Sequence, residues 1–294
     1  MADIHGLPCD IIFVRHGESE GNVASKFEDK GIEDLRARIA SKSIYDFRLT
    51  KKGVAQAQAT GKWIRENVST KFDKYYTSDL LRARETAAYL NFSDAKWLLE
   101  TDIREQYLPS RSTPSVDISL TRSVGIEQFI DTLLRSCVEM SVIVVCHATT
   151  IRSFMIRLEK LQYQNLSDVK KNPDLNVKNC EVVWYSRRNP STQKVSPEIS
   201  WKAMIVPYQT PKLTRRGVLW RKLIRPSFSN IDLMKSVEDS SPLLIVETEE
   251  ELERKYKEGA EEMVSRDISN NEVIHIGSSM SSSSFENVDI TTLL

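Results

Sequence analysis

Two short apolar runs in this chain end directly in a histidine. The first spans residues 11–14 (IIFV) and stops at Arg15-His16-Gly17, and the second spans residues 142–146 (VIVVC) and stops at His147. Short runs of β-branched and aromatic residues are typical of buried strands. Open α/β sheets bind their ligands outside the carboxyl ends of such strands. Because the chain has only four histidines, finding two of them at strand ends predicts a ligand site there.

The order of the apolar patterns predicts the fold class. Strand-like runs alternate with segments of helical periodicity up to about residue 205, and this alternation is typical of a mostly parallel sheet. We therefore expect an α/β fold, with a doubly wound, mostly parallel sheet and helices on both faces. The expected strands lie at 11–15, 73–76, 97–99, 142–146 and 181–187, and the expected helices at 31–41, 51–67, 79–90, 124–139 and 148–161.

Composition changes near residue 205, which suggests two parts. Residues 1–210 are expected to form a catalytic domain. Residues 211–294 comprise a basic run (211–226), an acidic stretch of helical composition (247–262) and a serine-rich end. A segment with so few apolar residues buries too little surface to offset its chain entropy, so we expect this part to be largely disordered. The basic run is either a solvated linker or a docking segment, and the tail could bind a protein partner.

Charge and cysteine content narrow the classes of function. The formal net charge is zero, which gives no reason to expect nucleic-acid binding. No apolar stretch approaches the ~18 residues of a membrane span, and the first ten residues lack the layout of a signal peptide. The four cysteines show no paired spacing and are expected to be reduced thiols. These features predict a cytoplasmic protein, with a nuclear location left open.

The polar residues near the predicted strand ends suit phosphoryl transfer. Arg15 and Arg82 offer planar, permanently charged groups that bind phosphate oxygens in pairs. One neutral histidine could attack phosphorus while the second stabilises the transferred group. A carboxylic acid must protonate the departing oxygen, and Glu105 is the candidate, with Asp102 as the alternative. Because arginines supply the positive charge, we expect neither a metal nor another cofactor.

Four motifs together resemble the histidine phosphatase superfamily, the group that includes phosphoglycerate mutases. They are RHGES at 15–19, LTxxGxxQA at 49–57, TSxLxRAxxTA at 77–87 and HxxxIR at 147–152. The motifs occur in the order of that family and cover about residues 10–187. The family fold is a doubly wound α/β sheet, which agrees with the expectation from the alternation of elements.

The resemblance also implies roles for individual residues. It implies that His16 is the phosphorylated nucleophile and that Glu105 is the proton donor. Ser19 is expected to lie beside the substrate. The remaining phosphate-binding residues implied by the family are Arg15, Asn22, Arg82 and His147.

Some neighbours of these residues depart from the family pattern. The family usually has glycine directly after the second histidine, where this chain has Ala148-Thr149. If that position needs a positive φ, the added methyl group reduces activity. Thr149 and Thr150 are expected to cap the helix that begins there. Ser78 or Asp79 could cap the helix expected at 79–90.

The spacing between Glu105 and His147 bears on the type of reaction. Most of this interval is assigned to the helix 124–139 and the strand 142–146, which leaves about 107–123 to cover the site. Phosphoglycerate mutases carry a longer insert there, and a short cover admits water, so we expect a phosphomonoesterase. The alternatives are a phosphoglycerate-type mutase and a catalytically weak phosphate-binding or scaffolding protein. The expected substrate is a phosphorylated small molecule or a phosphoprotein, and Arg111 and Arg122 are candidates for contacting further phosphates.

Overall fold

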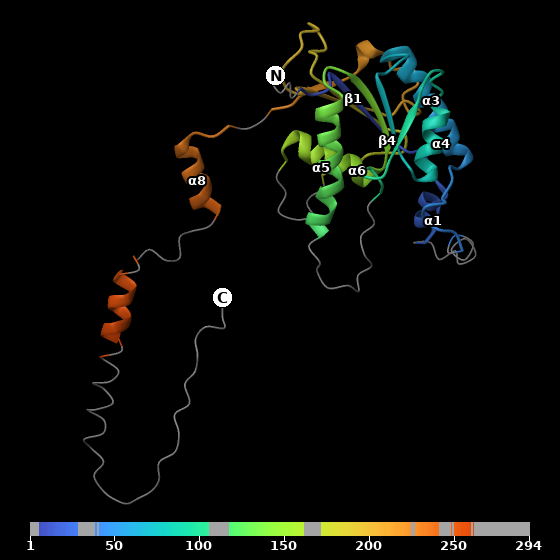
Figure 1. Cartoon of the computed structure of the whole chain (residues 1–294). Helices are drawn as coiled ribbons and strands as arrows, with labels where there is room; N and C mark the ends of the chain where they lie inside the picture. Colours follow the sequence, from blue (N-terminus) through green and yellow to red (C-terminus); the bar gives the residue numbers. More distant parts are fainter. Residues whose placement is uncertain are drawn as a thin grey trace, which may run out of the picture. The chain divides into compact units, whose positions relative to one another are not determined.

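The computed structural model of the chain describes two units, each of which is considered separately. The first comprises residues 1–226 and the second residues 227–294 (Figure 1). The described residues are 6–28, 39, 41–105, 118–161, 172–224, 227–240, 248, 250–259 and 261. None of the helices in these ranges is long and apolar enough to cross a bilayer.

The first unit is built on a seven-stranded sheet in the order β3-β2-β4-β1-β5-β6-β7. The strands β1 to β4 are parallel to one another, whereas β5, β6 and β7 continue the sheet as antiparallel neighbours. The strand bounds are β1 (Asp10–Arg15), β2 (Lys74–Ser78), β3 (Trp97–Glu100), β4 (Ser141–Cys146), β5 (Val182–Ser186), β6 (Trp201–Ile205) and β7 (Trp220–Lys222).

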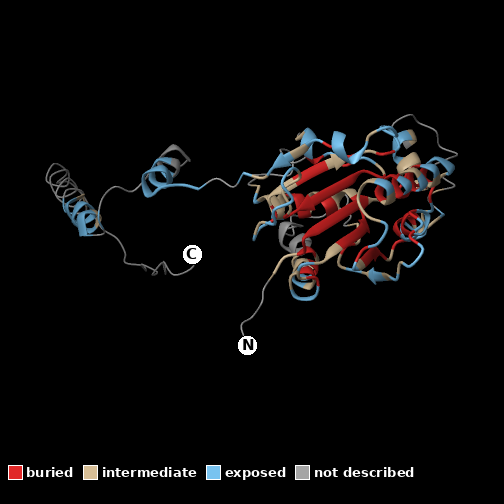
Figure 2. Ribbon diagram, turned by 90° about the horizontal axis from the view of Figure 1, so that it is seen from above, coloured by how far each residue is buried: buried red, intermediate tan, exposed pale blue. Residues whose placement is uncertain are grey.

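Helices cover both faces of this sheet, as Figures 1 and 2 show. Strand β1 alternates between the faces: Ile11 and Phe13 belong to the core beneath α5 (Ile118–Ser136) and α6 (Ala148–Glu159). Ile12 and Val14 belong to the core beneath α3 (Lys51–Asn67) and α4 (Leu81–Tyr89). All four side chains are at most 1% exposed, and burying each stabilises the fold by about 1.5–3 kcal/mol. The expected doubly wound α/β fold is confirmed.

The topology brings the two histidine-bearing strand ends together. Strand β1 pairs in parallel with β4, and the register places Arg15 opposite Cys146. His16 and His147 each follow the last residue of their strand. Because the carboxyl ends of neighbouring parallel strands meet at one edge of a sheet, both histidines reach the same edge.

The predicted elements agree with the structure to within a few residues, apart from one helix. Helix α5 begins at Ile118 rather than near residue 124. Helix α1 (Glu20–Glu28) and strands β6 and β7 are not predicted by the sequence patterns. The expected helix 31–41 lies mostly outside the described residues.

The boundary expected at residue 210 is wrong, because the first unit continues through the basic run. Trp63 Nε1 donates to the Leu213 carbonyl over 2.6 Å, and the rings of Trp184 and Trp220 lie 4.6 Å apart. Leu213 and Trp220 therefore pack against the core on this face of the sheet. Between them, the Arg215 guanidinium lies over the Trp184 ring, 5.4 Å from its centroid. In the second unit, α8 (Asn230–Ser240) and residues 250–259 are helical. The rest of the stretch expected to be disordered lies outside the described residues.

Candidate active site

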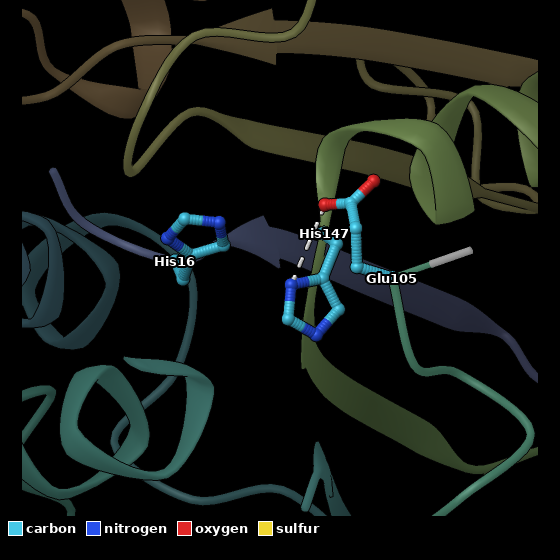
Figure 3. Close-up of side chains that lie close together, drawn as sticks. All are labelled: His16, Glu105 and His147. Atoms are coloured by element: carbon cyan, nitrogen blue, oxygen red, sulfur yellow. Dashed lines mark ion pairs between the residues drawn. The ribbon is translucent and has the colours of Figure 1, made fainter. Parts of the chain in front are cut away.

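His16, Glu105 and His147 converge at the edge of the sheet where β1 and β4 end (Figure 3). The imidazole rings lie 5.2 Å apart, centroid to centroid, and the His16 backbone N–H donates to the Cys146 carbonyl over 2.9 Å. His16 is 2% exposed and His147 is fully buried. The structure thus brings together the two histidines and the carboxyl group singled out in the sequence.

The ring of His16 is held in one tautomer. Its Nδ1 lies 2.7 Å from the Gly17 carbonyl oxygen, and because a carbonyl oxygen only accepts, Nδ1 carries the proton. The Nε2 lone pair is then available to an electrophile. Burial lowers the pKa of His16 well below its usual value, and the charges of Arg15 and Arg82 lower it further. His16 is therefore neutral at pH 7, as a nucleophile must be.

His147 is oriented by Ser78, at the end of β2. The His147 Nε2 atom lies 2.8 Å from the Ser78 hydroxyl oxygen. Burial lowers the pKa of His147 well below its usual value, helped by His16 and the two arginines. If the hydroxyl donates to Nε2, the proton of the neutral ring is on Nδ1. That Nδ1 is buried without a hydrogen-bond partner in the described part of the chain.

The helix-capping role expected for Ser78 or Asp79 is wrong. The residue at the N-cap of α4 is Leu80, and no side chain caps it. Ser78 instead orients His147, and Asp79 forms a two-point ion pair with Arg104. Both side chains are drawn to tertiary partners that a local pattern does not reveal.

The two arginines place positive charge beside the histidines. Arg82, on α4, is 3% exposed, and its Nη1 donates to the Ile44 carbonyl over 3.0 Å. Arg15 Nη1 donates to the Val177 carbonyl over 2.7 Å. The Arg15 Nε is buried and, among the described residues, lacks an acceptor. An unpaired buried donor is costly, so this atom and His147 Nδ1 mark a place for an acceptor such as a phosphate oxygen.

Asn22 is fixed with its amide nitrogen as the remaining donor. Its Oδ1 accepts from the Ser19 N–H (3.2 Å) and from the Ser19 hydroxyl (3.2 Å). Asn179 Nδ2 donates to the same oxygen over 3.0 Å and also to the His16 carbonyl over 3.1 Å. Ser19 is 1% exposed, so it supports Asn22 from within the structure.

Asn179 is the residue of this site that the sequence analysis missed. It lies more than 160 positions after His16 in a loop before β5, and no local pattern relates the two. The adjacent Cys180 has a φ of 54°, an unusual conformation for a residue with a side chain. Its N–H donates to the carbonyls of Arg15 and His16. The loop therefore holds the end of β1 in place.

Glu105 is positioned by Thr149, in the first turn of α6. Its Oε1 accepts from the Thr149 N–H (3.3 Å) and from the Thr149 hydroxyl. Its Oε2 lies 3.6 Å from His147 Nδ1. Of the two carboxyl groups considered, Glu105 rather than Asp102 joins the histidines, with ligand atoms of His16, Glu105 and His147 all within 4.8 Å of one another.

The start of α6 shows the backbone conformation of Ala148 and whether Thr149 and Thr150 cap the helix. Ala148 is the first residue of the helix and is absent from the residues with positive φ. Its methyl group therefore causes no backbone strain. The expected capping by Thr149 and Thr150 is wrong: His147 occupies the N-cap without a side-chain bond. Thr150 instead donates its hydroxyl to the Arg104 carbonyl over 3.0 Å.

The loop after His16 lies so close to the first turn of α3 that neither Gly17 nor Gly53 has room for a side chain. A Cβ on Gly17 would lie 2.5 Å from the Gly53 carbonyl oxygen, and one on Gly53 would lie 2.0 Å from the Glu18 oxygen. The Gly17 N–H donates to the Thr86 hydroxyl over 3.0 Å, and that hydroxyl donates to the Arg82 carbonyl over 2.7 Å. Three of the predicted motifs are thus joined by direct contacts.

The distances among His16, Glu105 and His147 would suit a metal ion, but the charges around them favour an anion. Two histidines and a carboxylate form a common ligand set. Arg15 and Arg82, however, are close enough to lower the pKa values of both histidines, and the same positive potential repels a cation. The donor-rich arrangement fits a phosphate group better.

Comparison with known proteins finds a family match over part of the chain. Residues 11–110 match the model of the histidine phosphatase superfamily, branch 1. The resemblance to the histidine phosphatase superfamily that the motifs predict is therefore confirmed for these residues. The match ends before His147, so the place of the second histidine comes from the structure.

The chain is also similar to individual members of that family. It is 35% identical over 92 residues to the 2,3-bisphosphoglycerate-dependent phosphoglycerate mutase of Lactobacillus acidophilus, covering 31% of this chain and 34% of that protein. It is 38% identical over 89 residues to the enzyme of the same name from Streptococcus pneumoniae, covering 30% of this chain and 32% of that protein. The chain thus spans about a third of the length of the curated relatives it matches.

Among solved structures, the α-ribazole phosphatase of Shigella flexneri is similar with a TM-score of 0.45 and 18% sequence identity. That similarity covers 65% of this chain and 98% of the other. Phosphatases and mutases are both represented among the proteins that this chain resembles.

Proposed function

We propose that this protein is a phosphomonoesterase that works through a phosphohistidine on His16. The observation that carries the proposal is the state of His16. It is neutral and buried, and its Nδ1 is committed to the Gly17 carbonyl, so that Nε2 is available to attack. Two buried nitrogen atoms, Arg15 Nε and His147 Nδ1, lie at the same site and make no hydrogen bond within the described part of the chain. A phosphate group would supply both acceptors.

In the first step, His16 Nε2 forms a bond to phosphorus as the bond to the ester oxygen breaks. Glu105 gives its proton to the departing oxygen, which leaves as an alcohol. Arg15, Asn22, Arg82 and His147 donate to the phosphoryl oxygens and stabilise the charge on them. In the second step, water attacks phosphorus, Glu105 takes its proton, and the N–P bond breaks to release phosphate.

The test is to trap the intermediate. Protein mixed with a radiolabelled phosphomonoester and denatured rapidly in alkali should retain label that is lost on mild acid treatment, as expected of a phosphohistidine. His16→Ala should carry none. A protein that releases phosphate rapidly while His16→Ala still becomes labelled would contradict the assignment of the nucleophile.

A phosphoglycerate-type mutase is the second candidate, because the curated relatives have that name. Hydrolysis is favoured by the short connection between Glu105 and α5, which consists of residues 106–117. A mutase must keep its intermediate away from water, whereas a phosphatase must admit water. Incubation with 3-phosphoglycerate distinguishes them: formation of 2-phosphoglycerate without free phosphate supports the mutase, and release of phosphate supports the phosphatase.

The same proposal includes the class of substrate and the cellular compartment. A phosphorylated small molecule or a phosphoprotein is the proposed substrate, and a panel of both classes assayed for phosphate release tests it. No measurable turnover across that panel would favour the alternative of a phosphate-binding or scaffolding protein. The four buried free cysteines support a reducing, cytoplasmic compartment, and a protein partner is proposed for the C-terminal tail.

A further inference from the structure

A second, strongly polar pocket opens beside the candidate active site within the first unit. Arg15 forms part of its wall, together with the ends of α1 and α3 and the loop before β5. Its volume is about 230 Å³, which is below the size of typical pockets for drug-sized ligands and suits a single small group. We call it the lysine pocket, and its basic members are Arg15, Lys26, Lys52 and Lys178.

The charges in the lysine pocket are out of balance. Its single carboxylate, Glu18, is already bound by Lys52 at 3.1 Å and Lys26 at 3.4 Å, and the Thr50 hydroxyl donates to it over 3.1 Å. Four cations therefore line the pocket with one carboxylate, and Glu181, which is not part of the lining, interacts with Lys178 and Arg15 and reduces the surplus of positive charge without removing it. Because like charges held together repel, such a surplus is stabilised by a bound anion.

A buried amide adds a neutral donor to the same wall. Gln56 is 8% exposed, and its Oε1 accepts the Glu18 N–H over 2.8 Å. This bond identifies the amide atom that faces Glu18 as the oxygen Oε1, so the other atom is the nitrogen Nε2. The NH₂ group then makes no hydrogen bond to the described part of the chain, although Gln56 lines the pocket. This NH₂ group reaches the open pocket, where it is available to an acceptor oxygen.

We propose that the lysine pocket binds a second oxyanion, a phosphate or carboxylate group, next to the phosphate at His16. Arg15 is shared by the two positions. The second anion is either part of the same ligand, such as a bisphosphorylated compound, or a separate free anion. The proposal concerns binding, so it holds whether or not the His16 site turns over.

The test is calorimetric titration of the full chain with inorganic phosphate at low salt. We expect two equivalents for the natural protein. Lys178→Gln should lose one equivalent or weaken its binding about tenfold, the loss expected when one charged hydrogen bond is removed. The matched control is Lys51→Gln, which removes the same charge from the neighbouring, exposed position of α3 and should leave both equivalents in place. Arg82→Gln should weaken the other equivalent.

Two results would overturn the proposal. One is the binding of a single equivalent of phosphate by the natural protein. The other is the binding of two equivalents with the same affinities by Lys178→Gln and by Lys51→Gln. Thermal unfolding of each variant identifies any that fails to fold, in which case Lys52→Gln takes the place of Lys178→Gln. A hexose 1,6-bisphosphate then distinguishes the sources. Displacement of both phosphates by one equivalent shows that one ligand spans the two positions, and displacement of only one shows that the second anion is separate.

Discussion

At the scale of single residues, the site depends on hydrogen bonds that fix which ring nitrogen carries a proton. The Gly17 carbonyl does this for His16, and the Ser78 hydroxyl holds the His147 ring through Nε2. Both partners lie within predicted motifs, yet their roles follow from the positions that the fold gives them and not from their spacing in the sequence. Two predictions belong to this scale.

Ser78→Ala should lower kcat about tenfold. The variant leaves His147 Nε2 buried without its partner, so Nδ1 no longer holds its proton preferentially, and one neutral hydrogen bond of about 1–1.5 kcal/mol is lost. Steady-state assays with a phosphomonoester across pH 5–8 measure kcat, KM and the shape of the pH profile. Ser191→Ala, on an exposed turn, is the control. An unchanged kcat and profile would show that Ser78 does not position His147.

The stability of the fold should decrease as the pH falls below about 6.5. Burial, with the nearby arginine charges, lowers the pKa values of His16 and His147 in the folded protein, whereas the unfolded chain takes up protons near the ordinary value. The stabilising contribution is complete above that ordinary pKa of roughly 6.5 and is lost at lower pH, by up to about 1.4 kcal/mol per pH unit for each histidine.

Urea unfolding at pH 7.0 and pH 5.5 measures this dependence. The free energy of unfolding should fall less steeply with decreasing pH in His16→Gln and in His147→Gln than in the natural protein, because each variant lacks one of the two groups. The carboxyl groups with lowered pKa values titrate at lower pH and do not dominate this window. Equal slopes for all three proteins would contradict the account.

At the scale of elements, the first turn of α3 and the loop after β1 fit together only because both have glycine at their contact. Thr50 caps this helix by accepting the Gly53 N–H over 3.0 Å, so the cap, the contact and the His16 loop occupy one small region. Through Thr50 and Gly53, the LTxxGxxQA motif therefore supports the loop that carries His16.

Gly53→Ala should destabilise the protein by about 1–3 kcal/mol and reduce activity, because its Cβ would push the Glu18 carbonyl and with it the loop after His16. Chemical unfolding and a phosphatase assay measure the two effects. Gly259→Ala is the matched control, since a Cβ there meets nothing within 4 Å. If both variants were equally stable, the contact would not be as tight as described.

At the scale of the whole molecule, the sheet is larger than its apolar runs indicate. Strands β6 and β7 extend it at one side, and the basic segment before β7 closes over Trp63 and Trp184. Most residues of this segment are exposed, including Arg215, which lies over the Trp184 ring, and this makes its composition similar to that of a linker.

A chain ending at residue 210 should be less stable than one ending at 226 by about 2–5 kcal/mol. The shorter form loses the partly buried Leu213 and Trp220 and the buried Val218, and each fully buried apolar side chain contributes about 1.5–3 kcal/mol. Tryptophan fluorescence during urea unfolding reports the change around Trp63 and Trp184. Equal midpoints for the two truncated forms would place the boundary at 210 after all.

The sequence by itself determined the parallel core, and it singled out the residues that the structure brings together at the candidate site. Runs such as 11–14 and 142–146 are long and apolar enough to require burial wherever they lie, and the polar residues at their ends must then reach the edge of a sheet. The choice of Glu105 over Asp102, the tautomer of His16 and the part played by Asn179 were decided only by the tertiary structure. Each depends on residues far apart in the chain becoming neighbours, and a local pattern carries no information about such distances. For the same reason, Thr149 and Ser78 were expected to cap helices but instead orient Glu105 and His147.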